Sequence, residues 1–133
     1  MLFTLAVSLF CPATLNAEKL KEVEVKILYV PCSKFVQKGD YVHVLYTGWL
    51  YETKKQFDSN VGGEPIRITV SAGQVIAGWE EGLIGTCEGE RRRLRIPSSM
   101  GYGERGYGNL IPPDSDLEFD IEMVRIDKRK KEF

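Results

Sequence analysis

The chain has 133 residues, of which 43% are hydrophobic and 28% charged, which is enough apolar material for one globular domain with a single core. Its formal net charge of −1 excludes the overall positive field of a typical nucleic-acid-binding protein, so we expect no nucleic-acid partner. One histidine in the whole chain excludes a multi-histidine zinc site, and we expect neither a metal nor a cofactor.

The first 17 residues carry no charged side chain and contain a central apolar run, and charges begin at Glu18. This pattern is typical of a secretory signal peptide ending at Ala17, although the usual basic residue near its start is missing. An N-terminal core helix is the alternative, and the segment is too short to span a bilayer comfortably. We therefore expect a signal peptide over 1–17, a domain over 18–127, a charged tail over 128–133 and no membrane span.

Removal of the signal peptide takes Cys11 with it and leaves two cysteines, Cys32 and Cys87. In an oxidising compartment an even pair favours a disulfide, and two free buried thiols are the alternative. A bridge closing a loop of this length stabilises a fold by about 4 kcal/mol in the loop-entropy model.

Five runs predict strands, and the first two consist mainly of β-branched and aromatic residues bounded by turn residues. The runs cover 23–30, 41–50, 66–71, 90–96 and 117–126. In the run 41–50 the side chains alternate between two faces, which separates His43 from Tyr46. We expect His43 to be a surface or partly packed histidine.

Two rows of charge indicate which strands are neighbours. Every second residue is an arginine in one run and an acid in another, and the rows are Arg91, Arg93 and Arg95, and Glu118, Asp120 and Glu122. Opposite charges facing across a strand pair are favourable by roughly 0.2 to 1 kcal/mol each. The sequence therefore predicts antiparallel neighbours with this face in solvent; a solvated charge row without pairing is the alternative.

The segment 75–85, VIAGWEEGLIG, predicts a short helix with one buried side that carries Trp79 and Leu83. Gly78 and Gly82 each cost roughly 1 kcal/mol against alanine in a helix, so close approach of another backbone would explain them, and Gly85 would be the C-terminal cap. The predicted fold is α+β: a curved antiparallel sheet of about five strands, a half-barrel, wrapped around this helix, with Trp79 at the bottom of the concavity.

Apolar and aromatic residues gather in predicted loops and at strand ends. They are Tyr46, Trp49, Phe57, Tyr102, Tyr107, Leu110 and Ile111, with Asp58 beside Phe57. Because loops normally expose polar residues, this set predicts a hydrophobic pocket, although burial in the core is the alternative for Phe57 and Trp79.

Five motifs in this order, VLYTGWL, QFDSN, GQVIAGWEEGL, GYGER and IPPDSDLEFDIE, resemble the FKBP-type peptidyl-prolyl cis-trans isomerases across residues 39–126. The expected signal peptide and the two remaining cysteines make the chain most similar to the small members of this family that reside in the endoplasmic reticulum lumen. The resemblance implies isomerase activity at X-Pro bonds, with Tyr46, Asp58, Ile76, Trp79 and Tyr102 as catalytic residues. It implies that the backbone N–H of Ile76 and the hydroxyl of Tyr102 bind substrate carbonyls.

The resemblance also implies one pocket for substrate and inhibitor, with Trp79 as its floor. The implied binding residues are Tyr46, Phe57, Asp58, Ile66, Gln74, Val75, Ile76, Trp79, Tyr102, Tyr107, Leu110, Ile111 and Phe119. Implied partners are proline-containing polypeptides and macrolide immunosuppressants, bound by a monomer in the endoplasmic reticulum lumen or, alternatively, secreted. A non-catalytic module that binds apolar peptide segments as a folding helper would use the same pocket.

The chain departs from the family pattern in three places. Ile66 stands where many members have an aromatic residue, which removes one wall of the pocket. The loop 59–64 lacks the arginine that often pairs with the aspartate, here Asp58, and Tyr107 replaces the histidine of the best-known flap.

Overall fold

A computed structural model describes residues 19–29, 32 and 34–129, so the expected signal peptide and the last four residues lie outside the described part. The elements in chain order are β1 (Glu24–Tyr29), β2 (Tyr41–Leu50), β3 (Gln56–Ser59), β4 (Ile66–Thr69), α1 (Ala77–Gly82), β5 (Arg91–Ile96), two short 3-10 turns (Ser98–Met100 and Gly103–Arg105) and β6 (Leu117–Asp127). Among the described helices, none is long and apolar enough to cross a membrane.

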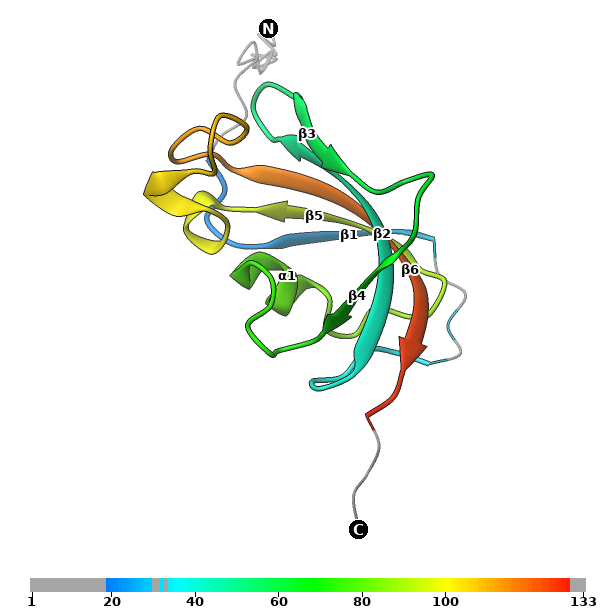
Figure 1. The fold of residues 1–133 in the computed structure, drawn as a ribbon. Helices are drawn as coiled ribbons and strands as arrows, with labels where there is room; N and C mark the ends of the chain where they lie inside the picture. The colour runs from blue at the N-terminus through cyan, green and yellow to red at the C-terminus, as the bar shows by residue number, and fades with distance from the viewer. Residues whose placement is uncertain (1–18, 30–31, 33, 130–133) are drawn as a thin grey trace, which may run out of the picture.

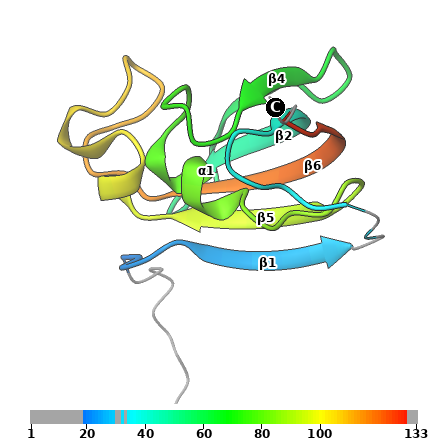
Figure 2. The ribbon, with the colours of Figure 1, turned by 90° about the horizontal axis from the view of Figure 1, so that it is seen from below.

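The strands form one antiparallel sheet in the order β1-β5-β6-β2-β3, with β4 also paired to β2. The sheet curves around α1 without closing, as Figures 1 and 2 show, which confirms the predicted half-barrel. It has six strands rather than about five, because Gln56–Ser59 forms β3. This segment is short and polar, so its strand conformation comes from pairing with β2 rather than from local propensity.

β2 shares one edge between two short partners. Residues 41–44 pair with β4 and residues 47–49 pair with β3, which leaves Leu45 and Tyr46 between them. The side chain of Asn60 fills this gap: its Oδ1 accepts from Tyr46 N at 2.6 Å and its Nδ2 donates to Val44 O at 3.0 Å. Asn60 therefore takes the place of a strand residue beside β2.

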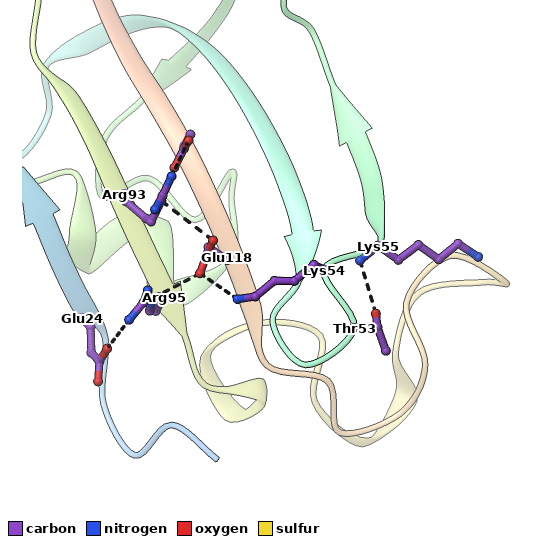
Figure 3. Close-up of polar contacts among 8 residues, drawn as sticks. Glu24, Thr53, Lys54, Lys55, Arg93, Arg95 and Glu118 are labelled. Carbon is purple, nitrogen blue, oxygen red and sulfur yellow. Dashed lines mark hydrogen bonds and ion pairs between the residues drawn. The ribbon is translucent and has the colours of Figure 1, made fainter. Parts of the chain in front are cut away.

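The charge rows on β5 and β6 face each other as predicted, with Arg91 opposite Glu122, Arg93 opposite Asp120 and Arg95 opposite Glu118. Arg93 Nε lies 2.6 Å from Asp120 Oδ1 and Arg95 Nε lies 3.1 Å from Glu118 Oε2. Figure 3 shows Glu118 between Arg93, Arg95 and Lys54. These side chains cover Glu118, which is only 7% exposed, so the charged face is in solvent only in part.

α1 is shorter than the predicted helix. It begins at Ala77, and Ile76 before it has the extended ψ of 152°. Leu83 is the C-terminal cap residue, so the expectation that Gly85 caps the helix is wrong; Gly85, with φ +80°, lies two residues beyond the cap. The apolar period continues past both ends because residues there contact the cavity or the core rather than extend the helix.

The two glycines of α1 confirm the predicted close approach to the sheet. A Cβ at Gly82 would lie 2.7 Å from Leu94 Cδ1 of β5, and a Cβ at Gly78 would overlap the side chain of Ile96. Both sheet residues are fully buried. The helix can therefore lie directly on β5 only because these positions lack side chains.

The predicted disulfide joins Cys32 and Cys87. Beside it lies a buried ion pair between Glu90, 1% exposed, and Arg92, 7% exposed. Glu90 Oε1 accepts from the backbone N of Cys87 at 3.1 Å, and Arg92 Nη1 donates to the carbonyl of Gly82 at 3.1 Å. The pair thus links the disulfide loop to the C-terminal end of α1.

The first two residues of the expected tail contact the domain. Lys128 Nζ lies 2.6 Å from Asp40 Oδ2, and the backbone N of Arg129 donates to Asp40 Oδ1 at 3.1 Å. Burial acts to raise the pKa of Asp40, but these hydrogen bonds and one from Gln37 N outweigh it and lower the pKa.

Candidate active site

A cavity of about 400 Å³ opens on the concave side of the sheet. Strands β2, β3, β4 and β6, the turn before α1, α1 itself and the loop after β5 all contribute to its wall. The lining residues are Tyr46, Phe57, Asp58, Ile66, Gly73, Gln74, Val75, Ile76, Trp79, Tyr102 and Phe119. Except for Gly73, all of them were predicted; Gly73 has no side chain and gave no signal in the sequence.

The floor of the cavity is a cluster of aromatic rings. Trp79, 4% exposed, packs edge-on against Tyr46 and against Phe119, each at 5.2 Å between ring centroids. Phe57 packs edge-on against Phe119 at 5.6 Å. These T-shaped contacts hold the indole in one orientation and present an apolar surface to a ligand.

Asp58 is the one carboxylate in the described cavity wall, and neutral donors satisfy both of its oxygens. The hydroxyl of Tyr46 donates to Oδ2 at 2.6 Å and the backbone N of Ser59 donates to Oδ1 at 2.8 Å. Among the described side chains no cation pairs with Asp58, in line with the missing loop arginine. Burial, together with the hydrogen bond to Asp58, raises the pKa of Tyr46 to about 12.

Several donors in the wall have no acceptor among the described residues, among them the hydroxyl of Tyr102, the backbone N–H of Ile76 and the buried indole Nε1–H of Trp79. The carbonyl of Ile76 accepts from the first turn of α1, which fixes the orientation of this residue. The side chain of Gln74 is held differently, because its Oε1 accepts from Thr69 N at 2.9 Å. Tyr102 and Ile76 therefore have N–H and O–H groups free for a ligand, and Gln74 braces the turn before α1.

Three predicted binding residues lie outside the cavity lining. Tyr107 and Leu110 are 60% and 53% exposed in the loop after the second 3-10 turn, and Ile111 is buried in the core at 2%. The ring of Tyr107 lies 5.3 Å from that of Tyr102, which places it next to the cavity wall. A role of these three in ligand binding stays a prediction.

Two further residues lie away from the cavity. Trp49, grouped with the pocket residues from the sequence, lines a separate hollow of about 270 Å³ with Leu45 and Thr47, because alternation along β2 points it to the other face. His43 Nε2 lies 3.1 Å from Asp127 Oδ2, outside the cavity lining, as predicted.

The cavity offers binding and orientation rather than bond-making chemistry. Its described wall contains no cysteine, serine, lysine or histidine that would act as a nucleophile or base. In the described part of the chain, no group of three or more His, Cys, Asp or Glu side chains is arranged to hold a metal ion.

Comparison with known proteins finds a match to the family model described as FKBP-type peptidyl-prolyl cis-trans isomerase over residues 32–124. The chain is 46% identical over 127 residues to FK506-binding protein 2 of Kluyveromyces lactis, covering 93% of this chain and 91% of the relative. It is 40% identical to the human peptidyl-prolyl cis-trans isomerase FKBP2 over 133 residues, covering 97% and 93%. Among solved structures, the crystal structure of AtFKBP13 superposes with a TM-score of 0.70 at 36% identity, covering 77% of this chain and 91% of that one.

Proposed function

The chain belongs to the FKBP-type peptidyl-prolyl cis-trans isomerases, and we propose that its concave cavity catalyses X-Pro rotation in secretory proteins as they fold and binds macrolide inhibitors at the same place. The observation that carries the proposal is the aromatic floor around Trp79, with the free donors of Ile76 and Tyr102 in the same wall.

The chemistry needs no nucleophile. Rotation about an X-Pro bond meets a barrier of about 20 kcal/mol because amide resonance must be lost. A twisted amide has less charge separation than a planar one, so an apolar cavity favours the twisted state over the ground state. An acceleration of about 10⁵-fold requires roughly 7 kcal/mol of such differential binding.

The proposed roles follow from the geometry. The proline ring lies on the indole of Trp79, whose tilt is fixed by Tyr46 and Phe119. The hydroxyl of Tyr102 and the N–H of Ile76 bind carbonyls on either side of the rotating bond. The hydroxyl of Tyr46 donates a hydrogen bond of 2.6 Å to Asp58. Asp58 is therefore a polar group in an otherwise apolar wall, and its carboxylate stays hydrogen-bonded.

Two observations support the proposed ligands and compartment. Relatives of this chain carry the name FK506-binding protein, which favours macrolide binding in the cavity. The disulfide between Cys32 and Cys87 favours an oxidising compartment. Among such compartments, the family resemblance favours the endoplasmic reticulum lumen.

A protease-coupled proline isomerisation assay tests the proposal, with and without a macrolide inhibitor. We expect catalysis that the macrolide abolishes, and a loss of about tenfold or more in kcat/KM for Trp79→Leu, equal to about 1.4 kcal/mol of transition-state binding. Trp49→Leu is the matched control, because Trp49 lies outside the cavity and its replacement should leave kcat/KM unchanged. Peptide binding without catalysis in the folded protein would instead favour the non-catalytic folding helper.

A further inference from the structure

β1 is an open edge of the sheet. It is the last strand in the order and pairs only with β5, and in the described part of the chain no segment covers its other side. Figure 2 shows β1 as the outermost strand. Such an edge presents a row of unpaired backbone N–H and C=O groups, which can pair with a further strand.

The inner face of β1 is apolar and uncovered. Val25 lies opposite Leu94 and Ile27 opposite Arg92, so both point to the side of the sheet that carries α1. Even so, Val25 is 46% and Ile27 53% exposed, because the six-residue α1 lies over β5 and does not cover β1. The edge therefore combines unpaired backbone with exposed β-branched side chains.

The outer face of β1 carries one charge of each sign, two residues apart. Glu24 lies 3.6 Å from Arg95 (Figure 3), whereas no carboxylate among the described residues pairs with Lys26. Since strand pairing places residues of like face opposite one another, an incoming strand that offers the reverse order of charges would fit this edge.

We propose that β1 pairs antiparallel with β1 of a second copy of this chain, about a two-fold axis at Val25. This register places Val25 opposite the partner's Val25 and Glu24 opposite the partner's Lys26, and by symmetry Lys26 opposite the partner's Glu24. A two-fold axis at Glu24 or at Lys26 would instead oppose like charges. The charge order of β1 is thus complementary to itself in one register.

The contact is small, because β1 has six residues. Interfaces that bury less than about 1,200 Å² in total belong to the weak, transient class, so the dimer forms at high protein concentration and the monomer prevails at low concentration. The cavity is not involved, since no residue of β1 lines it.

The test is sedimentation equilibrium of the mature protein, which follows the expected signal peptide, over rising concentration at low salt, with charge-reversal variants of β1. Glu24→Lys gives a strand with two lysines and Lys26→Glu one with two glutamates, so each variant alone opposes like charges across the axis. We expect each to lose the dimer, and an equal mixture of the two to recover it as a heterodimer. Lys55→Glu, on an exposed residue away from β1, is the matched control and should dimerise like the parent.

Isomerase activity and the thermal midpoint serve as checks that the variants fold. A protein that stays monomeric at all concentrations would overturn the proposal, as would a dimer that persists in both single variants or a mixture that fails to associate. Protection of β1 amides from hydrogen exchange only when an unfolded client protein is added would also overturn it, and would assign the edge to client strands.

Discussion

Replacing Arg92 with methionine should destabilise the fold strongly, because this side chain is the partner of a buried carboxylate. Arg92→Met keeps the apolar stem but removes the ion pair with Glu90, whose side chain is 1% exposed. It also removes the hydrogen bonds to the carbonyls of Gly82 and Ile84 at 3.1 and 3.3 Å. Glu90 would retain the backbone N of Cys87 as its donor.

Breaking a buried ion pair by removal of one partner costs about 3 to 5 kcal/mol, since the other charge stays buried without compensation. We therefore expect the free energy of unfolding to fall by about 4 kcal/mol, against a typical total of about 5 to 15 kcal/mol. Because the lost bonds hold the end of the helix that carries Trp79, we also expect weaker macrolide binding.

Urea denaturation with fluorescence detection measures the change, and Arg95→Met on the outer face of the same strand is the matched control. Its side chain is 36% exposed, so its loss should cost about 1 kcal/mol or less. The double variant Glu90→Leu/Arg92→Met should be more stable than Arg92→Met alone, because no charge stays buried. Equal effects of Arg92→Met and Arg95→Met would refute the reasoning.

Four further predictions follow from the site and the disulfide. Ile66→Phe should tighten macrolide binding by up to about 1 kcal/mol through added aromatic contact, measured by calorimetry; weaker binding in a folded variant would count against Ile66 as a wall of the occupied site. Isomerase kcat/KM should be nearly flat from about pH 6 to 8, and a bell-shaped profile abolished in a folded His43 or Asp58 variant would show that proton transfer takes part. The pKa of the Tyr46 phenol is raised to about 12 in the fold, against about 10.0 in the unfolded chain, so its contribution to stability should be complete below pH 10. Alkaline unfolding should show this contribution being lost as the pH rises through about 12. Removal of the disulfide by Cys32→Ser/Cys87→Ser should lower the free energy of unfolding by about 4 kcal/mol, and an unchanged urea midpoint would contradict the loop-entropy argument.

The local sequence pattern predicted the strands whose side chains alternate between two faces and the close contact between the helix and the sheet. β2 has the predicted bounds, and the opposed rows on β5 and β6 lie in the expected register because cross-strand charge pairs are visible in sequence. Gly78 predicted contact with the sheet, because glycine destabilises a helix and its presence there indicated close packing against another element.

Tertiary pairing and the ligand cavity explain what local pattern missed. β3 holds its strand conformation through β2, so its own residues gave no strand signal. Val75 and Ile76 continue the apolar period of α1, but they line the cavity from outside the helix. The set of lining residues came from the family resemblance rather than from periodicity, and the resemblance also included Ile111, which the structure buries in the core.

The side-chain amide of Asn60 holds the cavity walls in place independently of the loop that follows it. Its side chain bonds Tyr46 and Val44 of β2, while β3 before it carries Phe57 and β4 after it begins at Ile66. The three residues that follow it, 61–63, form an exposed turn whose glycine at 62 has no atom near its missing Cβ. Insertions in this turn would cost only about 0.6 kcal/mol of loop entropy per doubling of loop length. A longer turn in a homologous or engineered chain would therefore add new contacts at the mouth of the cavity, while Asn60 keeps β3 and β4 in place.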